Sequence, residues 1–409
     1  MTLTTAAPRA HDFRALWAGD LVSQTGSQLT TVVLPLLVVS TLDGTGTQAG
    51  LLQACYTAPF VLLPLLAGVW VERRARRPVL IGADLLRLVL VLAVPVLALT
   101  GSLTVEQVFL VAALGGTAAV VHDIAVAAYV PRLVPPGRLP HANSMLTANQ
   151  AVGGTAGPAV AGWAASAFGP AGALVLDGLS YLVSASALIL IRHREEAPER
   201  GPRPALRGQV AEGLRAVFRQ PVIRLVMTHA GLYNAGYALI AVAFLLFFVR
   251  DLGLGSARYG LVMVAGGLGA VTGALLTPIV VRRLGFGRMF AVAAPFSTVP
   301  YLLLPGADAS DTGFLRCALG FFLGSAGAAA GSVVATTLRQ RLTAANVLAR
   351  MTASYRLVAF GAMAVSSAAA GILADTFGAR AVLWCAPLVL IVSVLPVLHR
   401  TVRRVGQLD

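Results

Sequence analysis

The sequence predicts an all-α membrane protein whose twelve transmembrane helices form two six-helix bundles. Three observations indicate this: an apolar composition, a series of apolar runs long enough to cross a bilayer, and arginine gathered between alternate runs. Of the 409 residues, 57% are hydrophobic and only 12% are charged, whereas a soluble domain has about 25% charged residues. This composition leaves too little polar material to cover a water-facing globule.

Twelve runs of mostly apolar residues follow one another, and a spanning helix needs about 20 such residues. They cover 15–40, 48–71, 79–100, 105–130, 142–168, 171–191, 222–249, 259–281, 288–305, 312–337, 352–374 and 380–398. Each run is predicted to be a helix, because backbone groups in lipid must bond within their own segment and because polar and apolar residues do not alternate. The first run is longer than a signal-peptide core, so we expect it to remain as the first span.

Arginine marks one side of the predicted helices. All 31 basic residues are arginine, and when the gaps between runs are assigned to alternate sides, about 25 fall on one side and four on the other. Because an excess of arginine marks the cytoplasmic face, both termini are predicted to be cytoplasmic. Topology therefore accounts for the net charge of +14, and no nucleic-acid partner is expected. The Arg-only, Ala- and Gly-rich usage indicates a bacterium, so the apolar runs predict a multi-pass protein of the bacterial plasma membrane.

A Pro- and Arg-rich segment divides the chain into two sets of six runs. The expected domains are an N-terminal bundle at 1–191, a cytoplasmic linker at 192–221 and a C-terminal bundle at 222–409. Within the linker, residues 205–219 have a composition that suits a surface helix along the lipid headgroups.

The two sets of runs resemble each other. At an offset of 209 residues, Arg73-Arg74 meets Arg282-Arg283 and Phe168-Gly169 meets Phe377-Gly378. Parallel repeats of this kind are typical of transporters, whose central cavity lies between the halves near mid-membrane.

The stretch "GVWVERRARRPVL" at 68–80 places a dense basic loop between the second and third runs. It resembles the signature loop of the major facilitator superfamily, with matching residues at Gly68, Arg73, Arg76 and Arg77. Glu72 replaces the usual Asp, and the usual Gly is Ala here. The resemblance implies the major facilitator fold and a charge-assisted latch that closes the cytoplasmic side. A simple topology anchor is the alternative.

A second motif, "GGTAGPAVAG", lies in the fifth run. It resembles the antiporter motif of drug exporters, with matches at Gly153, Gly157, Pro158 and Gly162, while Ala161 replaces one Gly. Positions 153, 157 and 161 share a helix face where small residues let another helix pack closely, and proline bends the helix. The resemblance implies an exporter; tight packing without a transport direction is the alternative.

Stretches such as "FRALWAGDLVSQTGSQL" and "LDGLSYLVSASALILIR" are similar to the enterobactin-exporter and macrolide-efflux branch of that superfamily. One departure is Ser27, where that branch often has Asp. The resemblance implies secondary active export of a small drug-like or siderophore-like amphiphile, in exchange for protons. An importer or a sodium-coupled carrier of the same fold is one alternative, and a membrane sensor or lipid-modifying enzyme is another.

Ionisable residues inside the predicted spans are costly and usually face a cavity or a partner. Our candidates for proton coupling are Asp20, Asp123 and Asp177. Asp20 and Asp123 fall at the same depth from the cytoplasmic face as Asp84, Arg87, His122, His229 and Arg356, so the alternative is a structural layer of ion pairs. Asp177 lies toward the opposite side, and its own run contains no cation beside it.

Polar and aromatic side chains inside the runs are candidates for the wall of a substrate cavity. They are Gln24, Gln28, Gln53, Tyr56, Asn149, Tyr233, Asn234 and Tyr237. Such a mixed wall suits an amphiphilic solute, whereas hydrogen bonding between helices is the alternative for each residue alone.

Other chemistries lack sequence support. The three cysteines stand far apart inside predicted spans, and neither a metal-spaced His pair nor a phosphate-binding Gly-Lys-Ser/Thr loop is present. We therefore expect no metal, no cofactor and no enzymatic activity. The expected partners are a small-molecule substrate, protons and the lipid bilayer, with the chain acting as a monomer.

Overall fold

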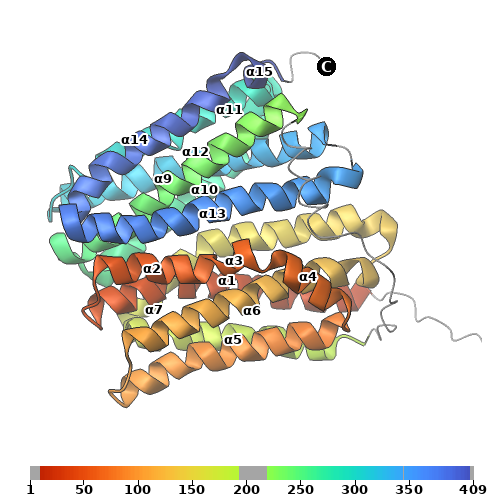
Figure 1. Ribbon diagram of the computed structural model, residues 1–409, viewed down its shortest axis with the longest axis horizontal. Helices are drawn as coiled ribbons and strands as arrows, with labels where there is room; N and C mark the ends of the chain where they lie inside the picture. Colours follow the sequence, from red (N-terminus) through yellow and green to blue (C-terminus); the bar gives the residue numbers. More distant parts are fainter. Residues whose placement is uncertain (1–9, 193–218, 344, 406–409) are drawn as a thin grey trace, which may run out of the picture. The chain divides into compact units, whose positions relative to one another are not determined.

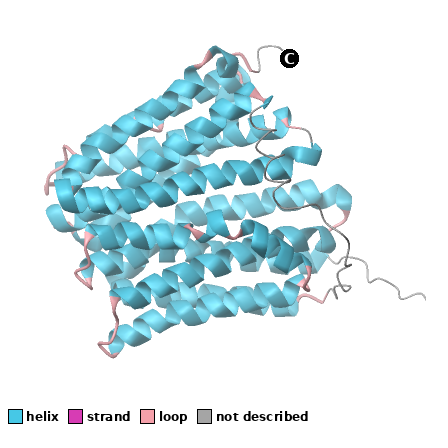
Figure 2. Cartoon of the chain, in the orientation of Figure 1, coloured by secondary structure: helices cyan, strands magenta, loops and turns pink. Residues whose placement is uncertain are grey.

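The computed structural model describes residues 10–192, 219–343 and 345–405, and every regular element in this part of the chain is a helix (Figure 1 and Figure 2). The predicted all-helical class is therefore confirmed. The surface helix expected at 205–219 lies, apart from Arg219, outside the described residues.

The chain folds as two compact units. Unit 1 comprises residues 1–37 and 62–202, and unit 2 comprises residues 38–61 and 203–409. The helices that lie wholly or mainly in unit 1 are α1 (Ala10–Ser40), α4 (Pro64–Glu72), α5 (Arg76–Leu99), α6 (Val105–Leu133), η1 (Pro136–Arg138) and α7 (Leu139–Leu190). Those of unit 2 are α2 (Gly46–Thr57), α3 (Pro59–Leu62), α9 (Pro221–Leu246), the π-helical turn η2 (Phe247–Asp251), α10 (Gly255–Leu284), α11 (Phe286–Phe296), η3 (Val299–Leu303), α12 (Asp311–Leu342), α13 (Ala345–Phe377), α14 (Ala379–Leu398) and α15 (Arg400–Arg403).

Within the described residues, nine helices are long and apolar enough to cross a bilayer, or ten if the broken helix at 46–72 counts as one span. The difference between these ten spans and the twelve predicted ones comes from two of the predicted runs. The run at 142–168 is the first part of α7, and the run at 288–305 breaks into α11 and η3. Pro295 and Pro300 lie at this break, where each lacks the backbone N–H that a continuous α-helix would use.

Two glycines show the 209-residue repeat in the backbone. Gly169 interrupts α7 with φ 72° and ψ 164°, between the predicted runs at 142–168 and 171–191. Gly378 stands between α13 and α14 with φ 86° and ψ 146°. A residue with a Cβ rarely adopts such angles, so glycine at both positions allows one helix to end and the next to begin without a longer loop.

In unit 1, α5 and α4 pack on α6, and α5 also packs on α7. The core that they enclose includes Phe13, Val71, Leu80 and Tyr129, one each from α1, α4, α5 and α6. Large apolar side chains such as Val89, 65% exposed, point away from this core. An exposed apolar face of this kind is suited to lipid.

In unit 2, α9 packs on α13 and α14, α10 packs on α12, and α2 packs on α13. The red α2 and the blue α13 run side by side in Figure 1 although they are far apart in sequence. Gly50 and Gly371 allow this close approach, because a Cβ on either would overlap backbone atoms of the facing helix. Residues 38–61 therefore group with unit 2, and the sequence-based domain boundary at 192–221 stays a prediction.

Candidate functional site

A polar contact joins α1 to the first part of α7. The Asn149 side-chain amide donates to the Asp20 carboxylate over 2.7 Å and to the Trp17 carbonyl over 2.9 Å. Asp20 is 4% exposed and Asn149 is 1% exposed. The structure thus brings one proton-coupling candidate together with one cavity candidate, and the hydrogen bond gives each of these two buried side chains a partner.

The same two helices stay in contact over the next two turns. A Cβ on Gly153 would lie 3.0 Å from the Gln24 backbone, and a Cβ on Gly157 would overlap the Cβ of Gln28. Each of these pairs has the same sequence separation as the Asp20–Asn149 pair, 129 residues. Because residues four apart share a helix face, this constant separation means that α1 and α7 run parallel here.

The predicted antiporter motif therefore forms a seam of close packing with α1. Gly162 is buried further along α7, and Pro158 is half-buried. The contacts account for the small residues at 153 and 157. Whether the motif also sets the direction of transport stays a prediction.

The second part of α7 contacts α1 around Asp177. One carboxylate oxygen of Asp177 accepts a hydrogen bond from the Thr30 hydroxyl, and the other accepts one from Ser180 Oγ over 3.0 Å. The neighbouring Tyr181 hydroxyl lies 3.1 Å from Ser27 Oγ. Asp177 is fully buried. Its two oxygens are thus both engaged by neutral hydroxyl groups.

A buried ion-pair cluster lies next to Tyr181. Arg87 of α5 donates to the Asp84 carboxylate, and His122 Nε2 of α6 lies 3.5 Å from the same oxygen. The Arg87 guanidinium carbon sits 4.5 Å from the centre of the Tyr181 ring, within the range of a cation–π contact. Asp123, the third coupling candidate, follows His122 and is half-buried. Asp84, Arg87 and His122 thus have the contacts that a structural ion-pair layer would have. Asp20 and Asp177, in contrast, accept hydrogen bonds from neutral donors.

Sequence reasoning missed three members of this network: Thr30, Ser180 and Tyr181. A signal was present, because Asp177, Ser180, Tyr181 and Ser184 are spaced to share one helix face. All four side chains are buried. A periodicity search for polar residues, as distinct from apolar ones, could have found them.

The signature loop joins α4 to α5, with Gly68 half-buried in α4. Arg77 donates to the carbonyls of Leu188 and Ile189 over 2.9 and 2.6 Å, which satisfies backbone groups at the end of α7. Arg76 is buried, and its Nη2 lies 3.5 Å from the backbone carbonyl of Glu72. The loop is thus attached to α7 by its final arginine.

Arg73 and Glu72 are both exposed at the end of α4, where Arg73 is the C-cap. This exposure leaves both charges at the surface of the protein. The proposed latch role of the loop stays a prediction.

The remaining cavity candidates lie in unit 2. His229, Tyr233 and Tyr237 follow one another along α9, with ring centres 5.8 and 6.2 Å apart, and the two Tyr planes differ by only 9°. Tyr301 continues this row, 6.2 Å from Tyr237. Asn234 donates to the Ala230 carbonyl of its own helix, so its amide is engaged within α9.

On α2, Gln53 and Tyr56 are half-buried, and Tyr56 lies 6.2 Å from the Phe60 ring. Three of the cavity candidates are therefore in unit 1 and five are in unit 2. Among the described residues, no group of three or more His, Cys, Asp or Glu side chains is placed to hold a metal ion.

Comparison with known proteins places these features in context. The family described as transmembrane secretion effector matches residues 3–409. The chain is 31% identical over 232 residues to the multidrug efflux pump Tap of Mycolicibacterium fortuitum, and 30% identical over 230 residues to the uncharacterized MFS-type transporter y4rN of Sinorhizobium fredii. These alignments cover 54% of this chain and 55% and 54% of the relatives, so the chain spans about half the length of the curated relatives it matches.

Solved transporter structures share the fold. A bacterial homologue of the iron transporter ferroportin, in its inward-facing state, matches with a TM-score of 0.74 at 19% identity over 94% of this chain and 97% of that one. The nucleoside transporter NupG matches with a TM-score of 0.70 at 12% identity, over 94% and 98% of the two chains. A bacterial homologue of the lysosomal transporter Spinster gives 0.68 at 15% identity, over 97% and 98%.

Proposed function

The chain belongs to the family of transmembrane secretion effectors within the major facilitator superfamily, and on that premise we propose that it expels a small amphiphilic molecule in exchange for protons. Membership makes it a multi-pass membrane transporter, not an enzyme. We further propose that it resides in a bacterial plasma membrane with both termini in the cytoplasm, because arginine gathers on that side of the predicted spans.

Export and an amphiphilic substrate are supported by two observations. The relative at 31% identity is a multidrug efflux pump by name, and its likeness covers half of the chain. The rings of His229, Tyr233 and Tyr237 follow one another on α9, and Tyr233 and Tyr237 are only half-buried. Aromatic faces bind planar apolar solutes by stacking and bind cations through their electron-rich surface.

In this proposal, the buried carboxyls at the contacts of α1 with α7 bind and release the exchanged proton. Asp20 and Asp177 accept hydrogen bonds from an amide and from hydroxyls respectively, and each side chain is at most 4% exposed. A carboxyl held by neutral donors can gain a proton without breaking an ion pair. When Asp177 gains a proton, its carboxyl becomes the hydrogen-bond donor and Thr30 Oγ1 becomes the acceptor.

The coupling follows from the cost of charge inside an apolar bundle. An ionised carboxylate there depends on every donor that it keeps. If α1 shifts against α7 during transport, Asp20 loses Asn149 or Asp177 loses Thr30, and a proton compensates for the lost donor. In this mechanism the chain alternates between states open to either side of the membrane, and the loop at 68–77 closes the cytoplasmic side.

Reconstituted vesicles provide the test. The full chain is placed in liposomes, a pH step is imposed, and the movement of the cationic dye ethidium is followed for the wild type, Asp20→Asn and Asp177→Asn. Each Asn variant should lose pH-driven accumulation and keep downhill dye exchange, since only the proton-carrying carboxyl is gone. Glu106→Gln, which removes an exposed carboxylate in the first turn of α6, is the matched control and should behave as wild type.

Three outcomes contradict the proposal. Wild-type accumulation in both Asn variants would exclude these carboxyls as proton carriers. Accumulation driven by a sodium gradient in place of the pH step would identify a sodium-coupled carrier. Dye accumulation only in the direction that corresponds to entry into the cell would identify an importer.

A further inference from the structure

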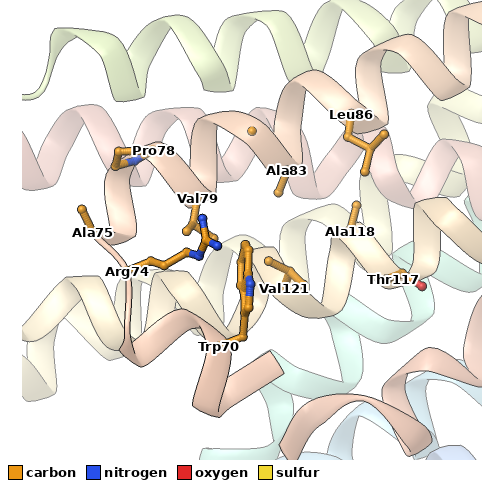
Figure 3. Close-up of a pocket in the computed structure, with 11 residues that line it drawn as sticks. Trp70, Arg74, Ala75, Pro78, Val79, Ala83, Leu86, Thr117, Ala118 and Val121 are labelled. Carbon is orange, nitrogen blue, oxygen red and sulfur yellow. The ribbon is translucent and has the colours of Figure 1, made fainter. Parts of the chain in front are cut away.

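A groove lies on unit 1 where α4, α5 and α6 meet. Its volume is about 580 Å³, within the range of sites that hold small molecules. Its lining consists of Trp70, Arg74, Ala75, Pro78, Val79, Gly82, Ala83, Leu86, Thr117, Ala118 and Val121. Figure 3 shows the apolar side chains of α5 and α6 along the groove and Arg74 beside the Trp70 ring.

Small residues make this groove hollow. Gly82 and Ala83 on α5 and Ala118 on α6 lack the bulk to fill the space between the helices. A Cβ built on Gly82 would meet no atom within 4 Å. Trp70 and Leu86 are each 44% exposed, so the groove opens onto the apolar face of the helices, where lipid lies.

One end of the groove is positively charged. The exposed Arg74 guanidinium carbon stacks 4.7 Å above the Trp70 ring. Next to it, Ala75 is the N-cap of α5, and its methyl side chain makes no cap hydrogen bond. The start of a 24-residue helix carries a partial positive charge, which attracts anions.

The groove thus combines apolar walls with a positively charged end, and most kinds of ligand would use only one of these two features. A water-soluble anion gains nothing from the apolar walls formed by Val79, Leu86 and Val121. A neutral lipid gains little from Arg74 and the start of α5. A ligand with an acyl chain and a negative headgroup uses both, and the Arg-rich side of a membrane protein is the side where anionic lipid acts.

We propose that this groove binds one acyl chain of an anionic phospholipid, with the lipid phosphate against Arg74 and the first turn of α5. Trp70 forms the boundary between the two parts of the site, because its indole ring contacts the chain on one side and the guanidinium on the other. The site is separate from the α1–α7 contacts and does not depend on the proposed proton exchange.

Quenching of Trp70 by brominated lipid provides the test. The chain has four tryptophans, and the variant Trp17→Phe, Trp163→Phe, Trp384→Phe retains only Trp70. This variant is reconstituted in phosphatidylcholine with increasing fractions of brominated phosphatidylglycerol or brominated phosphatidylcholine. Half-maximal quenching should need about tenfold less of the anionic lipid, the factor expected from one charge-assisted contact.

Two further substitutions in the same background separate the two parts of the site. Arg74→Gln should remove the preference for phosphatidylglycerol. Gly82→Phe should fill the groove without a clash near the backbone and reduce quenching by both lipids. Leu275→Phe, which enlarges an exposed apolar side chain on α10, is the control and should change neither result. Equal quenching by the two lipids, or a preference that survives Arg74→Gln, overturns the proposal.

A second measurement decides the matter if the three-Phe variant does not fold. Native mass spectrometry of the otherwise unaltered chain should show a retained phosphatidylglycerol adduct that is lost in Arg74→Gln and kept in Arg282→Gln. Arg282 is the matched control because it is an exposed arginine in the last turn of α10. Displacement of the adduct by inorganic phosphate alone would identify a simple anion site and overturn the acyl-chain assignment.

Discussion

The side-chain amide of Asn149 donates a 2.7 Å hydrogen bond to the carboxylate of Asp20. The two residues are 129 positions apart and belong to parallel stretches of α7 and α1. Since both side chains are buried, each depends on the other for a hydrogen bond that water cannot supply. The contact therefore connects the packing of the two helices to the state of a candidate proton carrier.

Asn149→Ala is expected to weaken both stability and coupling. It leaves a buried carboxylate without its amide donor, which costs about 1–3 kcal/mol of unfolding free energy. Thermal unfolding in detergent and dye accumulation driven by a pH step measure the two effects. Gln150→Ala, at the exposed neighbouring position, is the control. Unchanged accumulation in Asn149→Ala would show that the Asp20 contact is structural only.

Gly157→Ala is expected to force α1 and α7 apart. The new methyl group would overlap Gln28 Cβ and lie 2.8 Å from the Thr25 carbonyl oxygen. Overpacking of this kind costs about 1–3 kcal/mol, so the midpoint of thermal unfolding should fall. Gly154→Ala is a close control, because a Cβ there meets nothing within 4 Å. Equal midpoints for the two variants would contradict the close packing of this seam.

Asp375→Ala is expected to loosen the start of α2. The Asp375 carboxylate on α13 accepts from the backbone amides of Gly46 and Thr47 over 2.8 and 2.6 Å. Loss of such a cap costs about 0.5–2 kcal/mol, so amide exchange in the first turn of α2 should accelerate about two- to thirtyfold. Asp311→Asn, which removes an exposed salt-bridge partner of Arg258, should leave this exchange unaltered.

Asp308, in the loop before α12, should make the local structure sensitive to acid. The Ser310 hydroxyl and backbone N–H both donate to Asp308 and lower the pKa of its carboxyl. A lowered folded-state pKa contributes stability above the unfolded value of about 4 and loses it as pH falls through the folded value. Amide exchange at the start of α12, corrected for intrinsic rates, should therefore rise below about pH 4.

The matched variant for this loop is Asp308→Asn. It removes the titrating group together with its charge, so exchange at the start of α12 should already be raised at neutral pH and should no longer change as the pH falls. If Asp308→Asn kept the wild-type pH dependence, another group would be responsible for it.

Much of the fold could be read from the sequence because its determinants are local. A run of about 20 apolar residues predicts a span wherever it occurs, and the short gaps between the runs ending at 168 and 374 and the runs that follow them predicted the breaks where Gly169 and Gly378 take a positive φ. The same local reasoning selected Asp20 and Asn149, but as two separate candidates. It could not join them, because apolar runs do not specify the rotation of one helix against another.

Tertiary structure decided which polar groups meet. The hydroxyls of Thr30 and Ser180 around Asp177, and the ring of Tyr181 under Arg87, depend on how α1, α5 and α7 are turned toward one another. The hollow lined by Trp70 and Arg74 also exists only because α4, α5 and α6 meet there. Sequence thus specified the helices and predicts which side of the membrane the arginines mark, whereas packing set the partner of each buried charge, since contact distance depends on helix register and rotation.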